Sequence, residues 1–388
     1  MQAKGFLHKL LSSVMHKKRL STLSHMVVAG LKSKKLSLTS LGRAMVLPTQ
    51  ERSCIRRSDR FLGNKHLEKE RIFIYEAVIN RLVVNQNPDI IVDWSKMPNN
   101  TFHVLRASLV TKGRAITLYE ELHSESKLGN EKVQNNFLDQ LKKLLPKACV
   151  ANIITDAGFH TEWFKKITDL KWHYIGRIRA DSRRCYRADE NKPWEKLLPL
   201  YKTATNKPTY LGQMYLYKSK SIKTHFYLYK EKPKGRKLLN KSGAERSSSK
   251  ANKYKKSSRD PWLLVSSLSG RGMDKVVVNK YFQRMQIEES FRDLKSSQYG
   301  LGFEHAYSRK KERIQLLLMV GMLIVFIAWL TGLAAEKNKL QFQFQSNSTK
   351  DRRVLSLFYL GLQVIRKKIK IPNRLLWVAL EENSVWDF

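Results

Sequence analysis

The stretch YFQRMQIEESFRDLK, residues 281–295, places two adjacent glutamates in a chain whose formal net charge is +40. The surrounding residues, 276–300, predict one long helix that ends near Gly300. At about 100° per residue, four of its side chains share an arc of about 60°, namely Tyr281, Arg284, Glu288 and Lys295. An apolar stripe beside this arc can anchor the helix to a sheet and consists of Ile287, Phe291 and Leu294.

The two glutamates of this helix differ in direction. Glu288 lies beside the apolar stripe, so its carboxylate can be aimed at a site, whereas Glu289 points about 100° away and is expected in solvent. The helix considered alone favours a simpler interpretation, in which Glu288 forms an ion pair with Arg284 or Arg292. Acids elsewhere in the chain are needed to choose between the two interpretations.

The overall charge points to a polyanionic partner. Lys and Arg outnumber Asp and Glu by 73 to 33 in 388 residues, and such an excess repels itself unless a polyanion neutralises it. Nucleic acid is therefore the favoured partner class, ahead of an anionic membrane surface. Aromatic residues make up 10% of the chain and apolar runs recur, which excludes a disordered protein.

Cysteines and apolar segments limit the cellular setting. Cys54, Cys149 and Cys185 lie far apart without a CxxC spacing, which indicates neither a disulfide framework nor a zinc site and fits a reducing cytoplasm. The N-terminus has no long apolar stretch typical of a signal peptide. Residues 316–335 are uncharged and long enough to cross a membrane, but we expect this single segment to be buried inside a domain.

The N-terminal residues 1–75 are basic and predict helices. LSLTSLGRAM (36–45) and ERSCIRRSDRFLGN (51–64) flank a break at Pro48 and suggest a helix-turn-helix-like DNA reader. The second helix carries the candidate DNA-binding arginines Arg52, Arg56, Arg57 and Arg60. A helical hairpin with a solvated basic face is the alternative interpretation.

From residue 89 the pattern predicts a mixed sheet covered by helices. A first group of strands forms an antiparallel meander at 89–94, 101–110 and 114–122. Helices and strands then alternate at 131–146, 151–159, 160–170 and 172–180. Residues 181–260 are predicted to be a β-rich insertion with a basic loop at 230–256, before an apolar strand at 260–268.

Two aspartates stand at the ends of apolar strands. Asp93 closes DIIVDW and Asp156 closes ANIITD, and strand ends are where open α/β sheets tend to hold ligands. Either residue alone is as easily explained by a turn. Together with Glu288 they offer the oxygen ligands that Mg²⁺ prefers, and a pair of such ions supports phosphoryl transfer.

These motifs resemble those of the DDE transposases. DIIVDWS, TDAGF and the spacing Y-x2-R-x3-E-x6-K are similar to the three acidic signatures of the insertion-sequence-four family. RMQIEESFRDLKSSQYGLG, VLRAS, TLYE, RRSDRFLGN and DAGF-x3-WF resemble most closely its transposon-ten (insertion-sequence-ten) branch. The likeness spans about residues 20–365, and the C-terminal LEENSVWDF diverges from it.

The resemblance implies an α/β fold: a ribonuclease H-like catalytic domain of the retroviral-integrase superfamily with a β-rich insertion. Helical regions would flank it at both ends. The implied division of the chain is 1–75 for DNA binding, 76–180 and 261–335 for the core, 181–260 for the insertion and 336–388 for a helical C-terminal region. Asp93, Asp156 and Glu288 would be catalytic and would hold two Mg²⁺ ions, with Mn²⁺ as a substitute.

The activity implied is cut-and-paste transposition of double-stranded DNA. The enzyme would bind terminal inverted repeats, nick them, excise the element through DNA hairpins and join 3′ ends to target DNA. Trp262 in PWLLV would stack on a base expelled at the hairpin, although a buried strand Trp is the plainer interpretation. Tyr281, Arg284 and Lys295 would hold nearby phosphates.

The resemblance also implies a dimer in the synaptic complex, no membrane partner, and a place in the bacterial cytoplasm near the nucleoid. Two other functions share much of the same sequence pattern. One is a structure-specific, metal-dependent DNA nuclease on the same fold, and the other is a DNA-binding relic without activity.

Overall fold

The chain folds into two units that divide the sequence unevenly. The computed structural model describes all residues except 1, 34, 100, 182, 233–247, 250–259 and 384–388. Unit 1 consists of Met1–Cys149 and Met285–Phe388, and unit 2 consists of Val150–Arg284. The predicted basic loop at 230–256 lies largely outside the described residues, and the division of the sequence into five segments stays a prediction.

The N-terminal part of unit 1 is helical, as the sequence predicts. Its helices are α1 (Gln2–Leu11), α2 (Lys17–Lys32), α3 (Leu38–Arg43), α4 (Glu51–Leu62) and α5 (Lys65–Leu82). Side chains cap the starts of three of them: His16 accepts from the Lys18 N–H before α2, Ser37 from the Ser40 N–H before α3, and Asn64 from the His66 N–H before α5. Gly42 permits α3 to approach α4 closely, since a Cβ there would lie 2.6 Å from the Ile55 backbone.

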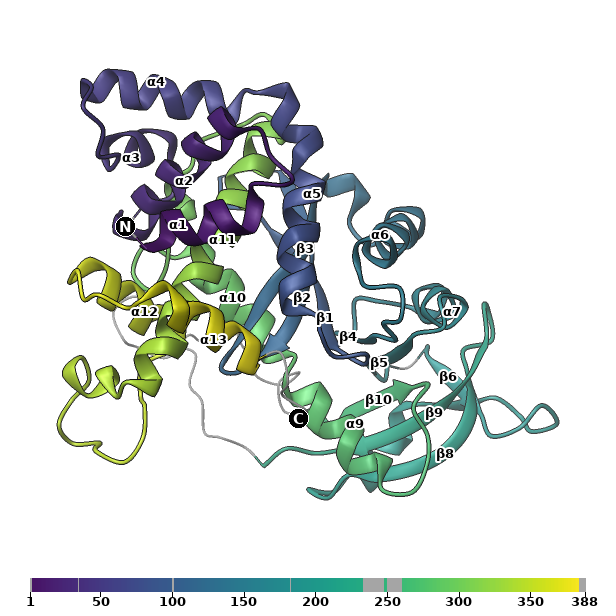
Figure 1. Cartoon of the computed structure of the whole chain (residues 1–388). Helices are drawn as coiled ribbons and strands as arrows, with labels where there is room; N and C mark the ends of the chain where they lie inside the picture. Colours follow the sequence, from purple (N-terminus) through teal and green to yellow (C-terminus); the bar gives the residue numbers. More distant parts are fainter. Residues whose placement is uncertain are drawn as a thin grey trace. The chain divides into compact units, whose positions relative to one another are not determined.

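Helix α11 (Lys311–Lys337) forms the centre of this helical region. It passes beside α2, α4 and α5, as Figure 1 shows in green and purple, and packs along α12 (Leu357–Arg366) and α13 (Asn373–Asn383). Among the described residues it is the one helix long and apolar enough to cross a membrane, and its apolar window is 100% buried inside the structure. The expectation that residues 316–335 are buried is therefore confirmed.

The sheet of unit 1 is the predicted antiparallel meander. Its strands are β1 (Asp89–Lys96), β2 (Phe102–Thr111) and β3 (Arg114–Ser124), joined in the order β3-β2-β1. Helix α6 (Glu131–Leu144) follows, and α10 (Met285–Lys295) packs against β1 and β3. Helix α5 runs along β3, where the Arg71 guanidinium donates to the Glu120 carbonyl at 3.0 Å.

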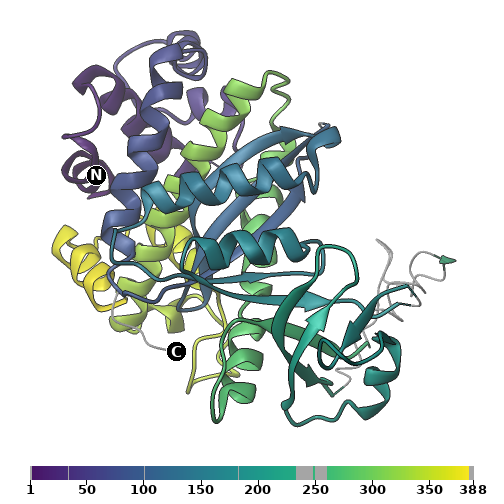
Figure 2. The same ribbon diagram turned by 90° about the vertical axis from the view of Figure 1, so that its right-hand side faces the viewer.

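Unit 2 contains one parallel and several antiparallel strand pairs. β4 (Asn152–Thr155) is parallel to β5 (His173–Ile178), and α7 (Thr161–Asp169) connects them. The remaining strands are β6 (Cys185–Arg187), β7 (Glu195–Lys196), β8 (Thr209–Leu216), β9 (Ile222–Tyr229) and β10 (Trp262–Ser266). Within the unit the order is β4-β5-β10-β9-β8-β6-β7, and β8 and β9 form the long twisted ribbon seen in Figure 2. The helix α9 (Met273–Phe282) packs on β8 and β9.

The prediction of one continuous helix at 276–300 is wrong. The segment is divided into α9 and α10 by a turn at Gln283 and Arg284, whose N–H groups bond to Lys280 O and Tyr281 O at 3.1 and 3.0 Å. These i→i−3 bonds end α9 with a tightened turn. Consequently Tyr281 and Arg284 do not share one continuous helical row with Glu288 and Lys295.

Candidate active site

The first predicted acid, Asp93, lies where β1 leaves the core. The four residues before it are buried, whereas Asp93 and the next two residues are half-buried. The strand runs on to Lys96, so Asp93 does not end it as predicted. The Trp94 N–H donates to Asp93 Oδ1 at 2.8 Å and fixes the carboxylate against its own strand. Trp94 itself packs edge-on against His123.

Helix α10 is joined to the same strand through Lys295. The Lys295 ammonium donates to Ser95 Oγ and to Lys96 O, each at 2.6 Å. Burial, together with the nearby Arg106, lowers the pKa of Lys295 to about 8, while the nearby Asp93 carboxylate acts in the opposite direction. Lys295 therefore lies close to Asp93.

Glu288 occupies the same side of α10 as Lys295. The two residues are seven positions apart, which is about two turns, so their side chains differ in direction by only about 20°. Glu288 is exposed. The side of α10 that carries Glu288 is therefore also the side on which Lys295 bonds to the end of β1.

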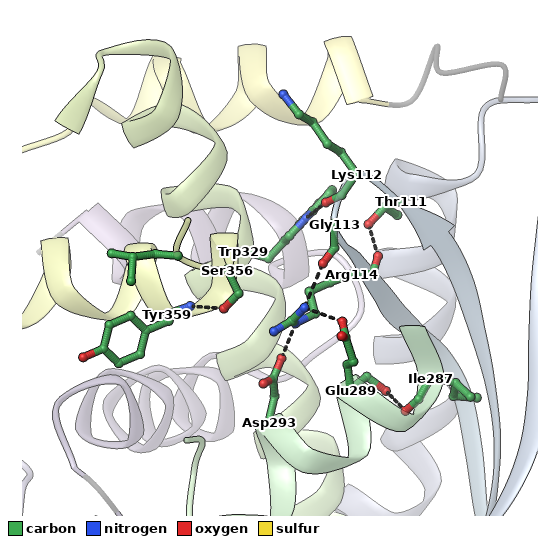
Figure 3. A network of polar contacts seen from close by, with 12 residues as sticks. Thr111, Lys112, Gly113, Arg114, Ile287, Glu289, Asp293, Trp329, Ser356 and Tyr359 are labelled. Carbon is green, nitrogen blue, oxygen red and sulfur yellow. Dashed lines mark hydrogen bonds and ion pairs between the residues drawn. The ribbon is translucent and has the colours of Figure 1, made fainter. Parts of the chain in front are cut away.

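The expectation for Glu289 is correct only in part, because its side chain is 42% exposed but its carboxylate is bound by a cation of the sheet. Its carboxylate forms an ion pair with Arg114 Nη1 at 2.6 Å, and Arg114 Nε pairs with Asp293 Oδ2 at 2.6 Å (Figure 3). A buried cation on β3 therefore holds Glu289, where the helix considered alone leaves that side to water. Asp293, a third carboxylate in the same stretch, is buried and lies outside the predicted site.

Asp156 and the tyrosine of the signature both belong to unit 2 and influence each other electrostatically. Asp156 follows β4, is half-buried, and accepts from the Gly158 N–H at 2.8 Å in a tight turn. Burial raises the pKa of Tyr281, and the Asp156 carboxylate also raises it, while Arg284 and Arg177 oppose this shift. These four side chains are therefore electrostatic neighbours, and the Arg284 guanidinium lies 6.0 Å from the Tyr281 ring centroid.

Trp262 belongs to an aromatic cluster beside Tyr281. Its ring centroid lies 5.0 Å from that of Tyr281, 4.6 Å from Phe282 and 5.6 Å from Tyr229. The side chain is half-buried, so one part of the ring is held by neighbours and another part is accessible. This position permits stacking on a base, which stays a prediction.

Residues 86–327 match the family model described as the transposase DDE domain. This chain belongs to the DDE transposase family. A comparison of this chain with curated proteins finds no match. Membership implies a ribonuclease H-like fold, in agreement with the α/β architecture, and a soluble, DNA-binding enzyme that cleaves and transfers strands with divalent metal ions.

The predicted DNA-reading arginines of the transposase lie on α4. All four are exposed, and within the described residues none of them pairs with a carboxylate; they are Arg52, Arg56, Arg57 and Arg60. The acids of α4 are already occupied, since Glu51 pairs with Arg43 at 3.1 Å and Asp59 with Arg313 at 2.6 Å. The exposed face of α4 is therefore cationic.

The candidate ligands suit a hard divalent cation in chemistry. Asp93 and Asp156 are half-buried carboxylates, each oriented by a backbone N–H, and Glu288 is exposed. Carboxylate oxygens of this kind are the protein ligands that Mg²⁺ uses. Within the part of the chain that the structure describes, no group of three or more His, Cys, Asp or Glu side chains is arranged to hold a metal ion.

The buried cations that pack against α10 were not predicted from the sequence. Arg106 on β2 pairs with Glu120 at 2.7 Å and lies 4.4 Å from the Phe291 ring centroid. Arg114 on β3 pairs with Glu289 and Asp293. A signal was present: VLRAS and the start of RAITLY place arginines in otherwise apolar strands, and a buried charge requires a partner.

Proposed function

We propose that the chain is a cut-and-paste transposase whose active centre consists of Asp93, Asp156 and Glu288. The observation that carries this proposal is the attachment of Lys295 to the end of β1. Because Glu288 shares a side of α10 with Lys295, this attachment supports a common site for Glu288 and Asp93. The two aspartates and the glutamate also occur in signatures that lie inside the matched transposase domain.

Asp156 is supported as the third member by its own neighbourhood. It follows a buried strand and lies near Tyr281 and Arg284, the first two residues of the signature that ends in Glu288 and Lys295. The proposed cofactors are two Mg²⁺ ions, for which Mn²⁺ can substitute. Bound there, they would polarise the scissile phosphate and lower the pKa of an attacking water.

The proposed reaction uses one displacement repeatedly. Water attacks the phosphodiester at the transposon end, and the bond to the 3′ oxygen breaks. The freed 3′-hydroxyl attacks the phosphodiester of the opposite strand, which forms a hairpin and releases the 3′-hydroxyl of the flanking DNA. A second water breaks the new hairpin bond and restores the 3′-hydroxyl of the transposon end. This 3′-hydroxyl then attacks a phosphodiester of the target DNA and displaces the 3′ oxygen of the target strand. The cations of Arg284 and Lys295 are suited to hold phosphates during these steps.

Hairpin formation requires a base to leave the stack. We assign Trp262 the role of receiving it, because the ring is half-buried in a cluster with Tyr229, Tyr281 and Phe282 that can keep it rigid. Stacking on such a ring contributes about 1–3 kcal/mol per base. The exposed arginines of α4 are the proposed contacts to the terminal inverted repeats.

The remaining assignments rest on the resemblance of the signatures. They are membership of the insertion-sequence-four family near its transposon-ten branch, a dimeric synaptic complex, and association with the bacterial nucleoid. All are compatible with the strongly basic composition.

The experiment that tests this function uses the DNA that flanks the reading frame. A linear fragment with both flanks and a supercoiled target plasmid are incubated with the protein and Mg²⁺. A transposase gives nicks, hairpins and joined products. Cleavage without joining would indicate the nuclease instead, and binding without either product would indicate an inactive relic.

A further inference from the structure

Helix α10 carries Glu288 and Lys295 but is short and begins at a turn. It has 11 residues, and its buried side chains include Ile287, Phe291 and Leu294. Burial of this apolar stripe turns one side of the helix to the sheet, but apolar contacts are non-directional and leave the finer rotation of the helix less strictly fixed. Directional bonds are required to decide which way Glu288 points.

Arg114 provides such bonds from β3. Its Nε donates to Asp293 Oδ2 and its Nη1 to Glu289 Oε2, each at 2.6 Å. The guanidinium is planar, so two carboxylates that meet it edge-on are fixed in direction as well as distance. Arg114 is 9% exposed and Asp293 3%, whereas Glu289 is 42% exposed. Figure 3 shows both acids reaching Arg114 from the same side of α10.

The turn that precedes Arg114 is itself fixed by hydrogen bonds. Arg114 Nη1 also donates to Gly113 O at 3.0 Å, and Gly113 adopts a positive φ of 71° that forms the tight turn before β3. The preceding carbonyl, Lys112 O, accepts from Trp329 Nε1 at 3.2 Å, which ties the turn to α11. Arg114 thus projects from a fixed point toward α10.

We propose that Arg114 is a positioning residue for the transposase active site. Arg114 binds Glu289 and Asp293 and thereby sets the rotation of α10 about its axis. This rotation determines the direction in which Glu288 points. The acids that Arg114 holds lie about 130° around the helix from the row of Glu288 and Lys295. Hydrogen bonds to Arg114 and from Lys295 therefore hold α10 on two different sides.

Helix geometry gives the displacement of the Glu288 carboxylate that is expected when Arg114 no longer binds α10. A side chain extends about 5–6 Å from the helix axis, so a rotation of about 20° moves the Glu288 carboxylate by about 2 Å. Misplacements of about 1 Å at a reacting group can reduce rates about 100-fold. Outer residues that orient metal ligands typically change metal affinity about 10- to 100-fold. This inference rests on the proposed role of Glu288.

The test compares Arg114→Lys with Val78→Ala in the full-length protein. Lysine retains the charge but cannot bridge two carboxylates in one plane. Val78 is fully buried in α5 and serves as the control for lost stability. Two quantities are measured: hydrogen exchange of the α10 amides without metal or DNA, and the Mg²⁺ concentration that half-saturates nicking.

We expect Arg114→Lys to accelerate α10 exchange and to raise the half-saturating Mg²⁺ concentration about 10-fold or more. The Val78→Ala control should change neither quantity at temperatures where both variants are equally folded. Glu289→Gln, which removes the more exposed partner, should reproduce part of both effects if Arg114→Lys folds poorly. Equal behaviour of Arg114→Lys and Val78→Ala would overturn the positioning role.

The exchange measurement separates this inference from the proposed function. If Glu288→Gln nicked DNA like the wild type, the assignment of Glu288 would be wrong, yet α10 exchange would still report whether Arg114 orders the helix. Unchanged α10 exchange in both Arg114→Lys and Glu289→Gln would reject the positioning role whatever the activity.

Discussion

Replacing Asp293 by Asn should change how the stability of the protein depends on pH. Asp293 is buried beside Arg114, and burial raises its pKa from 3.8 to about 6, although Arg114 opposes the shift. Between these pH values the folded state holds a proton that the unfolded state has released. Raising the pH through this window removes the proton from the folded state, so the Asp293 contribution to stability is present below pH 4 and is lost as the pH passes 6.

The size of this contribution follows from the shift. The rise in the pKa of Asp293 from 3.8 to about 6 corresponds to a change of about 3 kcal/mol in the free energy of unfolding. Asn does not titrate, so the variant lacks this part of the pH dependence. The free energy of unfolding of the wild type, minus that of Asp293→Asn, should therefore fall by about 2 kcal/mol between pH 4 and pH 6, and by about 3 kcal/mol over the whole titration.

Denaturant titrations at half-unit pH steps measure this difference directly. Ser290→Ala is the matched control, because Ser290 is buried on the same helix and carries no group that titrates in this range. Its difference from the wild type should stay constant with pH. A flat or rising difference for Asp293→Asn would show that Asp293 does not carry a raised pKa beside Arg114.

Three further predictions concern DNA binding, hairpin formation and helix packing. Trp262→Ala should stall the reaction after the first nick while Trp262→Phe retains part of the hairpin yield; normal hairpin yield in Trp262→Ala would rule out the stacking role. A double change of Arg56 and Arg57 to Gln should lower DNA affinity and reduce the slope of log affinity against log salt by about 1.8, and an unchanged slope in titrations at several salt concentrations would remove α4 from the interface. Gly361→Ala should lower the free energy of unfolding by about 1–3 kcal/mol, because its Cβ would lie 1.7 Å from Ala328 O, whereas Gly63→Ala meets no atom within 3.5 Å and should unfold like the wild type.

Local sequence patterns were sufficient to predict most elements of the fold. The meander is encoded by apolar strands around the turn at Lys112 and Gly113, and α6 is encoded by one apolar face that ends before Pro146. The break between α9 and α10 was not predictable in this way. Residues 276–295 contain no Gly or Pro, so propensity favours one helix, and the turn at Gln283 coincides with the boundary between the two units.

The candidate site was predictable only in part for a related reason. The acids stand at recognisable positions, but their partners are distant in sequence. Glu289 is 175 residues from Arg114, and Lys295 is 200 residues from Ser95. Helical periodicity places both glutamates correctly around α10, yet it assigns Glu289 to water because it contains no information about the buried cation on β3.

Three single variants test whether Asp93, Asp156 and Glu288 together perform the chemistry. Asp93→Asn, Asp156→Asn and Glu288→Gln are assayed for binding and for nicking of DNA that carries the flanks of the reading frame, in Mg²⁺ and in Ca²⁺. We expect each variant to bind DNA like the wild type in either ion and none of them to nick DNA in Mg²⁺. If any one of the three nicked DNA like the wild type, its acid would not belong to the catalytic group.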